Sequence, residues 1–586
     1  MLKASKYIDA QLFINIPSLP HNHTSSTSGR IQAHNLTHKN SRLESNFHPL
    51  IISRGRCPTA SKMDSIFTTD IDRVCDLDNQ GDYDFVVVGS GLAGGTLTRR
   101  LIENNKRVLL IEKGGMIFST HCLNTSRPHW ETNSVEGPTQ DNDIVYNVVK
   151  QKVATAPGSD VYVGGPVYCL GGRSTVWGLY SPAITERKHR AFFPQNISDY
   201  LEDTGYKRAF GLLTNESQNY HHVYPRDDIN ATELSTAEGD LNDAIKEFYQ
   251  KIGKSSPHKV HLSPMASEFK STKLYSFPQG AYSTVDYLLD RTYKRDANLT
   301  ILLNTEVLTV SKDTNTGQLA LKVRPSSGDR TYQISAKTVI LSAGTIGTAR
   351  IALTSGLQKQ LPLVGKGLTD HDIWGVRFRM MTTQELKDPV KLQCRLLIGG
   401  EDALLNVAIN ADSFLARQFS SSQTFSEEGK LLDDEPSADE KYNTVNITIE
   451  TQALLSDANE VLNVPSPEPV VRIKRRNKDP VAYAAEQDQM QELATLIRNK
   501  LMGTESGEKA PRLSVAGLGA VAHEVGTMRM EGPRSTEDFV VNKNLQVRGY
   551  DNLYVCDLSI FPFSPPANPS LTLAAIALQL ADRLAA

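Results

Sequence analysis

Three features of the sequence predict an α/β fold joined to a second part built on an antiparallel sheet. Residues 84–115 predict a buried strand, a glycine-rich turn, a helix and a second buried strand. A further strand, glycine and helix follow in the same order from Thr338 to Leu353. Between residues 372 and 510, several segments instead alternate apolar and polar side chains, which is typical of antiparallel strands with one buried face. These segments are Trp374–Met380, Leu404–Ala411, Tyr442–Thr451 and Val470–Lys474.

The turn within residues 84–115 has the spacing of a dinucleotide-binding fingerprint, G-x-G-x-x-G. Gly89 permits the tight turn, Gly91 lets backbone N–H groups approach a pyrophosphate, and Gly94 lets the helix pack closely on the strand. Glu112 ends the second strand, where a carboxylate can accept hydrogen bonds from ribose hydroxyls. A tight turn that binds nothing is the alternative. We favour a dinucleotide site that includes Gly89, Gly91, Leu92, Ala93, Gly94 and Glu112.

Composition and charge argue against several classes of function. The net charge of −3 over 586 residues gives no basic field for a nucleic acid partner. The six cysteines form no CxxC pair and no metal-like spacing with histidine, so we expect reduced thiols and no metal site. No apolar run approaches the roughly 20 residues of a membrane span. No signal peptide is evident, which favours an intracellular location, although several N-x-S/T sequons leave secretion open.

The first 80 residues differ in composition from the rest of the chain. They are rich in Ser, Asn, His and Thr and have little sustained periodicity, which predicts a disordered leader. Met63 is an alternative start, because the chain after it leads directly into the first strand. We assign residues 81–184, 282–371 and 511–586 to the nucleotide-binding domain, and residues 185–281 and 372–510 to the second domain.

Two further stretches contain candidate site residues. Gly164–Pro182 is dense in glycine. Its backbone can approach a ligand closely at three small residues, Gly171, Gly172 and Ser174. A loop packed under the first helix is the alternative, and we favour a cofactor contact. The C-terminal stretch contains His523, a short apolar strand that ends at Asp557, and Asn568-Pro569 just before the last helix. Ligands of open α/β sheets bind at the carboxyl ends of strands and at helix N-termini.

Four blocks of the chain, in this order, resemble the glucose–methanol–choline (GMC) flavoprotein oxidoreductases. They are the fingerprint that ends at Glu112, GGRSTVWG at 171–178, GKGLTDHD at 365–372, and the C-terminal run HEVGTMRM, NLYVCDLSIFP and ANPSLT. The resemblance spans residues 81–586 and implies a Rossmann-like FAD-binding domain assembled from discontinuous segments. It also implies an α+β substrate domain whose antiparallel sheet lies over the flavin ring.

The resemblance assigns roles to individual residues. Glycines 89, 91 and 94 match the pyrophosphate turn, and Glu112 the ligand of the adenosine ribose. Val307 matches a backbone contact to adenine. Gly171, Gly172 and Ser174 match the loop along the flavin, and Asp557 with the Asn568-Pro569 backbone matches contacts to the ribityl chain and the isoalloxazine ring. Residues 171–178 contain no histidine that would form the covalent flavin link of some members, so we expect non-covalent FAD.

The resemblance also implies the chemistry, which is oxidation of a CH–OH group of a small alcohol or sugar. His523 matches the catalytic histidine and would take the hydroxyl proton, while hydride passes to flavin N5. Asn568 would hold the hydroxyl oxygen; asparagine at this place is similar to the pyranose 2-oxidase-like subset of the family. Oxygen or a quinone would accept the electrons. His371 is expected to be structural, fixing the segment that passes between the domains.

Three other functions remain open at this point. A flavoprotein lyase or isomerase of the same fold would turn over without net oxidation. A flavin-binding protein without catalytic activity would keep the fingerprint and lose the chemistry. An NAD-dependent enzyme is the third, because the fingerprint alone does not choose between dinucleotides.

Overall fold

The computed structural model describes residues 67, 71, 74, 83–124, 142–214, 231–255, 258–266, 280–313, 317–382, 390–411, 420–428, 430–432, 440–474, 480–503, 510–534 and 538–586. All of them belong to one unit of the chain, Ala60–Ala586. Most of the predicted leader, including Met63, lies outside the described residues.

Three residues of the predicted leader differ from the expectation of disorder. Phe67, Ile71 and Val74 are buried in the same hydrophobic core as the first strand. Ile71 and Val74 are helical, and their spacing of three residues puts both on one face.

The nucleotide-binding part is built on a parallel sheet of five strands in the order β20-β9-β1-β2-β5. Every neighbouring pair in this sheet is parallel. Because helices cover both faces of such a sheet, its strands are continuous apolar runs, and β1 and β2 are buried along their whole length. The strands are β1 (Phe85–Val88), β2 (Val108–Ile111), β5 (Leu299–Leu302), β9 (Val339–Leu341) and β20 (Leu553–Val555).

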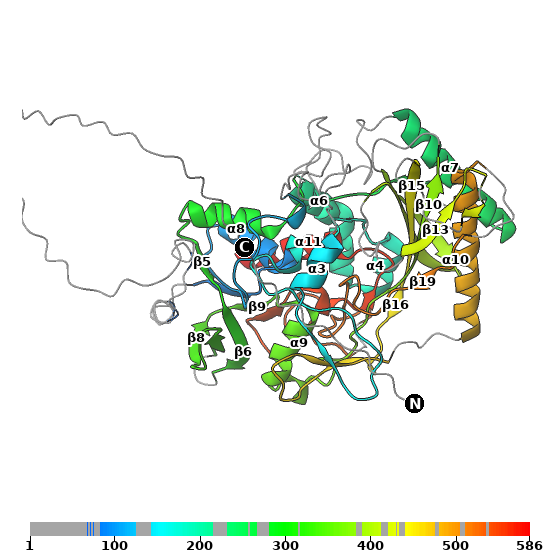
Figure 1. The fold of residues 1–586 in the computed structure, drawn as a ribbon. Coiled ribbons are helices and arrows are strands. Elements are labelled where there is room, and N and C mark those ends of the chain that lie inside the picture. The colour runs from blue at the N-terminus through cyan, green and yellow to red at the C-terminus, as the bar shows by residue number, and fades with distance from the viewer. Residues whose placement is uncertain are drawn as a thin grey trace, which may run out of the picture. The chain divides into compact units, whose positions relative to one another are not determined.

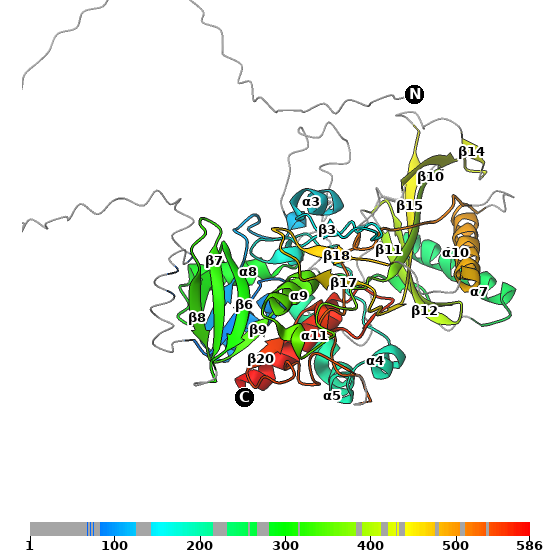
Figure 2. The ribbon, with the colours of Figure 1, turned by 90° about the horizontal axis from the view of Figure 1, so that it is seen from below.

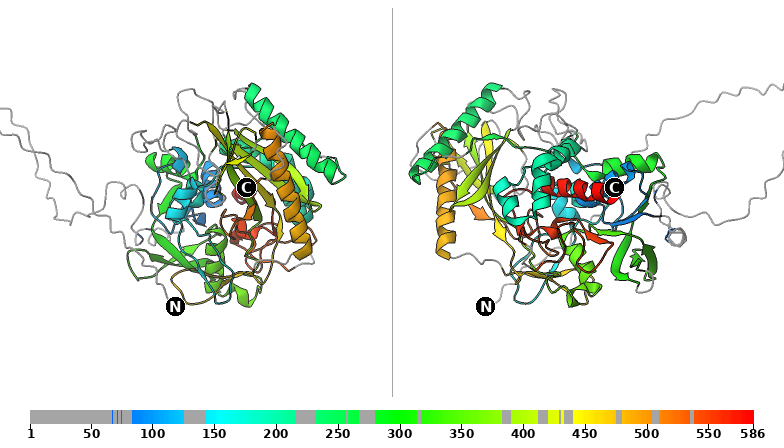
Figure 3. Two further views of the ribbon diagram at one scale, coloured as in Figure 1. Left: turned by 45° about the vertical axis from the view of Figure 1, so that its right-hand side comes forward. Right: turned by 180° about the vertical axis from the view of Figure 1, so that it is seen from behind.

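Four helices pack around this sheet, and they come from distant parts of the chain. α2 (Leu92–Glu103) follows the glycine turn, and the last helix, α11 (Ser570–Ala585), packs directly against it. Figure 3 shows α11 in red, beside the blue and green elements of the first half of the chain. α8 (Thr284–Tyr293) and α9 (Gly344–Thr354) complete the set.

A small antiparallel sheet of three strands stands beside the parallel sheet (Figure 2). Its strands are β6 (Thr305–Lys312), β7 (Leu319–Pro325) and β8 (Tyr332–Ala336). The pairing of β6 with β7 shifts register between Val307 and Thr309, which marks an irregularity in the ladder beside Val307.

The second large sheet has eight strands, in the order β14-β13-β10-β15-β12-β11-β4 with β19 paired to β10. Its apolar face packs on two long helices, α7 (Ala231–Lys251) and α10 (Pro480–Leu501), which lie on the right of Figure 1. All neighbouring pairs are antiparallel except β10 with β13, which is parallel. The strands are β4 (His261–Leu262), β10 (Asp372–Met381), β11 (Val390–Ile398), β12 (Glu401–Ile409), β13 (Ser420–Phe425), β14 (Leu431–Leu432), β15 (Tyr442–Thr451) and β19 (Ser514–Val515).

One of the predicted antiparallel strands pairs outside the eight-stranded sheet. Val470–Lys474 forms β18 (Val470–Arg472), which does not join the eight-stranded sheet. It pairs antiparallel with β17 (Glu460–Leu462) and parallel with β3 (Ala154–Thr155). Alternation over three residues predicts a strand but carries no information about its partner.

The remaining described elements are short and mostly connect the sheets. They are the helices α3 (Asn142–Val149), α4 (Glu186–Phe192), α5 (Gln195–Tyr200) and α6 (Tyr206–Thr214), the single turns η1 (Cys122–Asn124), η3 (Gly172–Thr175), η4 (Leu201–Gly205), η5 (Leu357–Lys359) and η6 (Leu558–Ile560), and the strand pair β16 (Ala453–Leu454) and β21 (Phe563–Ser564). No helix in the part of the chain that the structure describes is long and apolar enough to cross a membrane.

Candidate active site

A cavity of about 530 Å³ runs from the glycine turn to the strands of the eight-stranded sheet. The predicted site residues that line it are Gly89, Gly91, Leu92, Ala93, Glu112, Gly172, Ser174, Val307, His523, Asp557 and Asn568. Gly94, Gly171 and Pro569 do not line it. The cavity therefore joins residues from both ends of the chain in one continuous space.

The glycines of the two loops serve different purposes. A Cβ at Gly94 would lie 1.9 Å from the carbonyl oxygen of Gly89, so this glycine lets α2 pack on the turn. A Cβ at Gly91 would meet no protein atom within 4 Å, because this residue faces the cavity. Gly171 has φ +86°, and a Cβ there would lie 2.3 Å from the side chain of Val285, so it fits the loop under α8. Gly172 approaches Gly91 itself, with its Cβ position 3.3 Å from that Cα.

Glu112 is buried and holds the glycine turn in place. One carboxylate oxygen accepts hydrogen bonds from the backbone N–H and the hydroxyl of Ser90, at 3.0 and 2.6 Å. The other accepts from the N–H of Gly114 at 3.0 Å. Burial raises the pKa of this carboxyl, and these hydrogen bonds oppose that shift. Glu112 thus lines the cavity and also fixes the turn that begins α2.

Asp557 has an equivalent role at the end of β20. Its carboxylate accepts hydrogen bonds from the N–H of Gly344 at 3.0 Å and from the hydroxyl of Thr348 at 2.5 Å. The other oxygen accepts from the N–H of Ser559 at 2.9 Å. Asp557 therefore fastens the strand end to the N-terminus of α9, and both contribute to the cavity lining.

His523 and Asn568 meet at the far end of the cavity, although 45 residues separate them in sequence. The amide nitrogen of Asn568 lies 3.5 Å from Nε2 of His523. The amide oxygen of Asn568 is buried and makes no hydrogen bond. His523 follows Ala522, which has a left-handed backbone with φ +60°, in the loop after β19. The pair thus presents one ring nitrogen and one amide to the same space.

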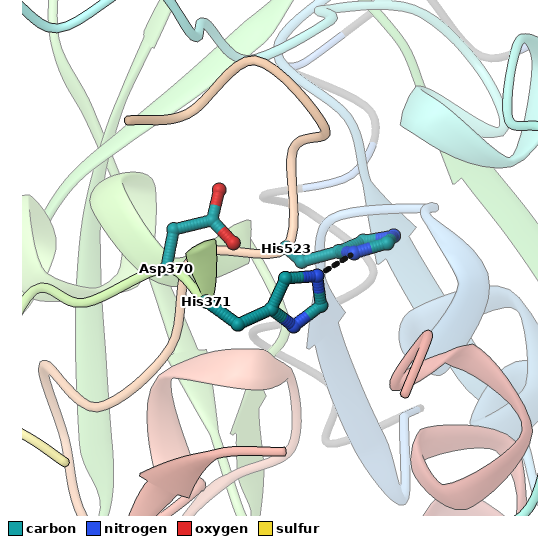
Figure 4. Close-up of side chains that lie close together, drawn as sticks. All are labelled: Asp370, His371 and His523. Atoms are coloured by element: carbon teal, nitrogen blue, oxygen red, sulfur yellow. Dashed lines mark hydrogen bonds between the residues drawn. The ribbon is translucent and has the colours of Figure 1, made fainter. Parts of the chain in front are cut away.

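The GKGLTDHD segment brings a second histidine, His371, close to His523. His371 is buried, and its Nε2 lies 3.2 Å from Nδ1 of His523 (Figure 4). The two rings meet edge to face, with centroids 5.0 Å apart. Nδ1 of His371 contacts the carbonyl oxygen of Pro565 at 2.7 Å. His371 is therefore in direct contact with the predicted catalytic histidine. The sequence signal for this contact was its place within the GKGLTDHD block.

An ion pair between the half-buried Arg173 and the buried Glu524 supports the other side of the His523 loop. The guanidinium of Arg173 donates to both carboxylate oxygens of Glu524, at 2.6 and 3.1 Å. The hydroxyl of Tyr162 donates to the same carboxylate. Arg173 also donates to the backbone carbonyl of Ala522 at 3.0 Å. The glycine-rich loop is thus tied to the residues on either side of His523, a link that the sequence did not predict.

The eight-stranded sheet presents polar side chains to the cavity. Asn406, Thr448 and Glu450 line it from β12 and β15. The amide of Asn406 donates to Glu450 at 3.1 Å, and Gln393 donates to Asn406 at 2.7 Å. Oε2 of Glu450 makes no hydrogen bond, and burial raises the pKa of Glu450 to about 8. The alternation of Tyr442–Thr451 contained this signal, because Asn446, Thr448 and Glu450 share one face of the strand.

Asp370, His371 and His523 each offer a donor atom close enough to share a metal ion, since these atoms lie within 4.8 Å of one another. One oxygen of Asp370 already accepts a hydrogen bond from Gly519 at 3.2 Å. Burial, together with the charge of Glu524, raises the pKa of Asp370 well above its usual range, which favours the neutral acid over a ligating carboxylate. Hydrogen bonding accounts better for this cluster.

Two family models match the chain in the order expected for one protein. Both describe GMC oxidoreductases: the N-terminal model matches residues 264–373 and the C-terminal model residues 458–577. The chain therefore contains both of the segments that the GMC oxidoreductase models describe. Members of the GMC family are FAD flavoproteins.

Several characterised GMC relatives are similar over half of the chain. Ecdysone oxidase of Bombyx mori is 24% identical in an alignment of 336 residues that covers 50% of this chain and 45% of that protein. Pyranose dehydrogenase of Agaricus campestris is 25% identical over 315 residues, 50% of each chain. Sinalpyl alcohol oxidase Nec3 of Nesocodon mauritianus is 25% identical over 293 residues, 47% of this chain and 45% of that protein. The chain spans about half the length of the curated relatives it matches.

Solved structures of the GMC fold confirm the predicted fold class. Pyridoxine 4-oxidase from Mesorbium loti aligns with a TM-score of 0.55 and 16% identity over 86% of this chain and 99% of that chain. Formate oxidase of Aspergillus oryzae RIB40 aligns with a TM-score of 0.55 and 16% identity over 86% and 98%. The likeness extends over 86% of the chain, whereas the family models match two separate segments.

Proposed function

We propose that the protein binds FAD non-covalently in the cavity and oxidises a CH–OH group of a small-molecule alcohol or sugar. One observation supports this most strongly: the His523–Asn568 pair lines the same cavity as the glycine turn of the nucleotide fingerprint. A nucleotide bound at the turn and a substrate at the pair would therefore share one continuous space.

The residues present fit a dinucleotide. Gly91 and Gly344 both line the cavity, and a Cβ at either would meet no protein atom within 4 Å. The Cα side of each residue is therefore open to a ligand, although the N–H of Gly344 already donates to Asp557. Gly344 begins α9, whose N-terminus favours negative charge. Val307 lines the cavity from β6, at the register shift, where backbone groups leave the regular ladder.

Non-covalent attachment is favoured by the side chains that line the cavity. Among the described residues that line it, His523 is the only histidine, and there is no cysteine. His121 is buried elsewhere: its Nε2 contacts the carbonyl of Trp177 at 3.0 Å and its Nδ1 accepts from the N–H of Leu123 at 3.1 Å. Both of its nitrogens are therefore engaged, and neither is a nucleophile for a flavin.

The chain itself supplies the base and the group that orients the substrate. Burial lowers the pKa of His523, so its ring is neutral at pH 7 and can accept a proton. The substrate hydroxyl donates to Nε2 of His523, while its oxygen accepts from the amide of Asn568, which fixes the geometry for reaction. FAD, when bound, would supply the hydride acceptor, with oxygen or a quinone as the final electron acceptor.

The polar side chains of the sheet favour a substrate with more than one hydroxyl group. Thr448 and Glu450 line the cavity, and Oε2 of Glu450 has no hydrogen-bond partner. A second substrate hydroxyl would provide that partner, because it can accept from the neutral acid as well as donate to the carboxylate, and an unpaired buried carboxyl oxygen costs free energy.

The test is to purify the full chain, record its absorbance and precipitate it with acid. We expect the visible flavin bands in the native protein and release of intact FAD into the supernatant. A colourless protein that takes up no added FAD contradicts the cofactor assignment, and flavin that stays with the precipitate contradicts non-covalent binding. Turnover of a hydroxylated compound without any electron acceptor would instead identify a lyase or isomerase.

A further inference from the structure

A chain of hydrogen bonds behind His523 determines which of its ring nitrogens carries the proton. Nδ1 of His371 lies 2.7 Å from the carbonyl oxygen of Pro565. A carbonyl oxygen can only accept, so this nitrogen donates and carries the hydrogen. Burial lowers the pKa of His371 to about 4, which makes the ring neutral at pH 7. Nε2 of His371 therefore has a free lone pair.

That lone pair points at His523. Nε2 of His371 is 3.2 Å from Nδ1 of His523 (Figure 4). Two lone pairs at this distance would repel each other, so Nδ1 of His523 donates the hydrogen. The pKa of His523 is lowered by burial and further by His371 and Arg173, so this ring is neutral as well. Its own lone pair is left on Nε2, the atom beside the amide of Asn568.

We propose that His371 is a positioning residue that holds His523 in the tautomer protonated on Nδ1, with Nε2 left to accept the substrate proton. The inference rests on the proposed function, because it assigns the base of that reaction. A neutral histidine that must act as a base is useful in only one of its two tautomers, and a buried partner on the other nitrogen selects it.

The charged groups around the two rings leave this arrangement intact at neutral pH. Oε2 of Glu450 is 3.6 Å from Nε2 of His371, which is beyond hydrogen-bond distance. The raised pKa values of Glu450 and Asp370 favour their neutral acids. Glu524 is occupied by Arg173 and Tyr162. None of these groups displaces the contact from His523 to His371.

The test compares two variants of the FAD-loaded full chain, His371→Gln and His371→Leu. Glutamine retains an oxygen that can accept from Nδ1 of His523, whereas leucine fills similar space without an acceptor. In protein labelled with ¹⁵N-histidine, long-range ¹H–¹⁵N spectra distinguish protonated from bare ring nitrogens. The His523 signal is identified by its loss in His523→Asn.

We expect the wild-type ring of His523 to be protonated on Nδ1 and bare on Nε2. In His371→Leu the ring should populate both tautomers, and the rate constant of flavin reduction should fall at least about tenfold, because an orienting partner of the base is lost. Substrate affinity should stay within about twofold, because His371 does not line the cavity. His371→Gln should recover most of the rate.

Three results would overturn the inference: a wild-type His523 protonated on Nε2, a His371→Leu variant that reduces its flavin at the wild-type rate, or stoichiometric zinc bound at these rings after dialysis against EDTA. A wild-type ring protonated on Nδ1 in a protein whose flavin no alcohol reduces would support the tautomer assignment and reject the proposed function instead.

Discussion

Burial and hydrogen bonding both act on the imidazole ring of His523. Its pKa is lowered mainly by burial, and its Nδ1 faces a histidine that is itself neutral. The remaining nitrogen is directed at Asn568 and the cavity. A base of this kind is already deprotonated at neutral pH, so it needs no activation before a substrate binds.

This environment predicts an unusual pH dependence for flavin reduction. An imidazole with its ordinary pKa near 6.5 would lose about three quarters of its free base at pH 6. Because the pKa of His523 is lowered, its free base persists below that pH, and we expect the limiting rate of flavin reduction to change little between pH 7.5 and 5.5. Anaerobic stopped-flow measurements over this range would check it. A decline centred near pH 6.5 would show that the ring titrates normally.

At the scale of elements, two glycines of the turn between β1 and α2 have different roles: one allows close packing, and the other faces the cavity. Gly94 is required because α2 lies against the carbonyl of Gly89, whereas Gly91 has no protein neighbour at its Cβ position. The sequence pattern predicted both glycines as one motif. Their different roles depend on their distances to other segments of the fold. The sequence motif carries no information about those distances.

Gly91→Ala should therefore leave the fold intact and weaken FAD binding. Its backbone, with φ −59°, suits alanine, and the added methyl group would enter the cavity. We expect a normal circular dichroism spectrum and a clear loss of FAD per chain after gel filtration. Gly239→Ala is the matched control, since Gly239 is an exposed residue of α7 with no neighbour at its Cβ position. Equal FAD content in Gly91→Ala and wild type would contradict this.

Strand β15 shows how much of an element can be predicted from its sequence. The alternation predicted its bounds, Tyr442–Thr451, and the apolar face with Val445, Ile447 and Ile449 packs on the helices as expected for such a pattern. The pattern did not show what the other face contacts. Thr448 and Glu450 on that face are buried and line the cavity.

Glu450→Gln should stabilise the protein at alkaline pH and have little effect at acidic pH. The pKa of Glu450 rises from 4.5 to about 8 on folding, so the folded state binds the extra proton and loses stability as the pH rises through 8. A shift of this size corresponds to at most about 5 kcal/mol above pH 8. Melting temperatures at pH 5.5 and 9 would reveal the difference. Glu186→Gln is the control, because Glu186 is an exposed carboxylate on α4. The same shift of the melting temperature in both variants would refute the raised pKa of Glu450.

At the scale of the whole molecule, the site exists only because distant segments converge. His371 and His523 are 152 residues apart in sequence, and Arg173 reaches Glu524 across 351 residues. The sequence predicted the fold class, and the structure places most of the predicted site residues around one cavity. It did not predict the contacts of His371, Glu450 and Arg173, because these depend on how the loops and sheets pack together. The predicted domain boundaries stay a prediction.

The central claim is that the flavin oxidises a CH–OH group with His523 as the base. Its most direct test is anaerobic mixing of the FAD-loaded protein with a panel of alcohols, polyols and sugars, while the visible flavin band is recorded for wild type and His523→Ala. We expect at least one compound to bleach the wild-type flavin. The variant should retain FAD but reduce it at least about 100-fold more slowly, the usual contribution of a general base. A flavin that no compound reduces, or an equal rate in the variant, would contradict the account.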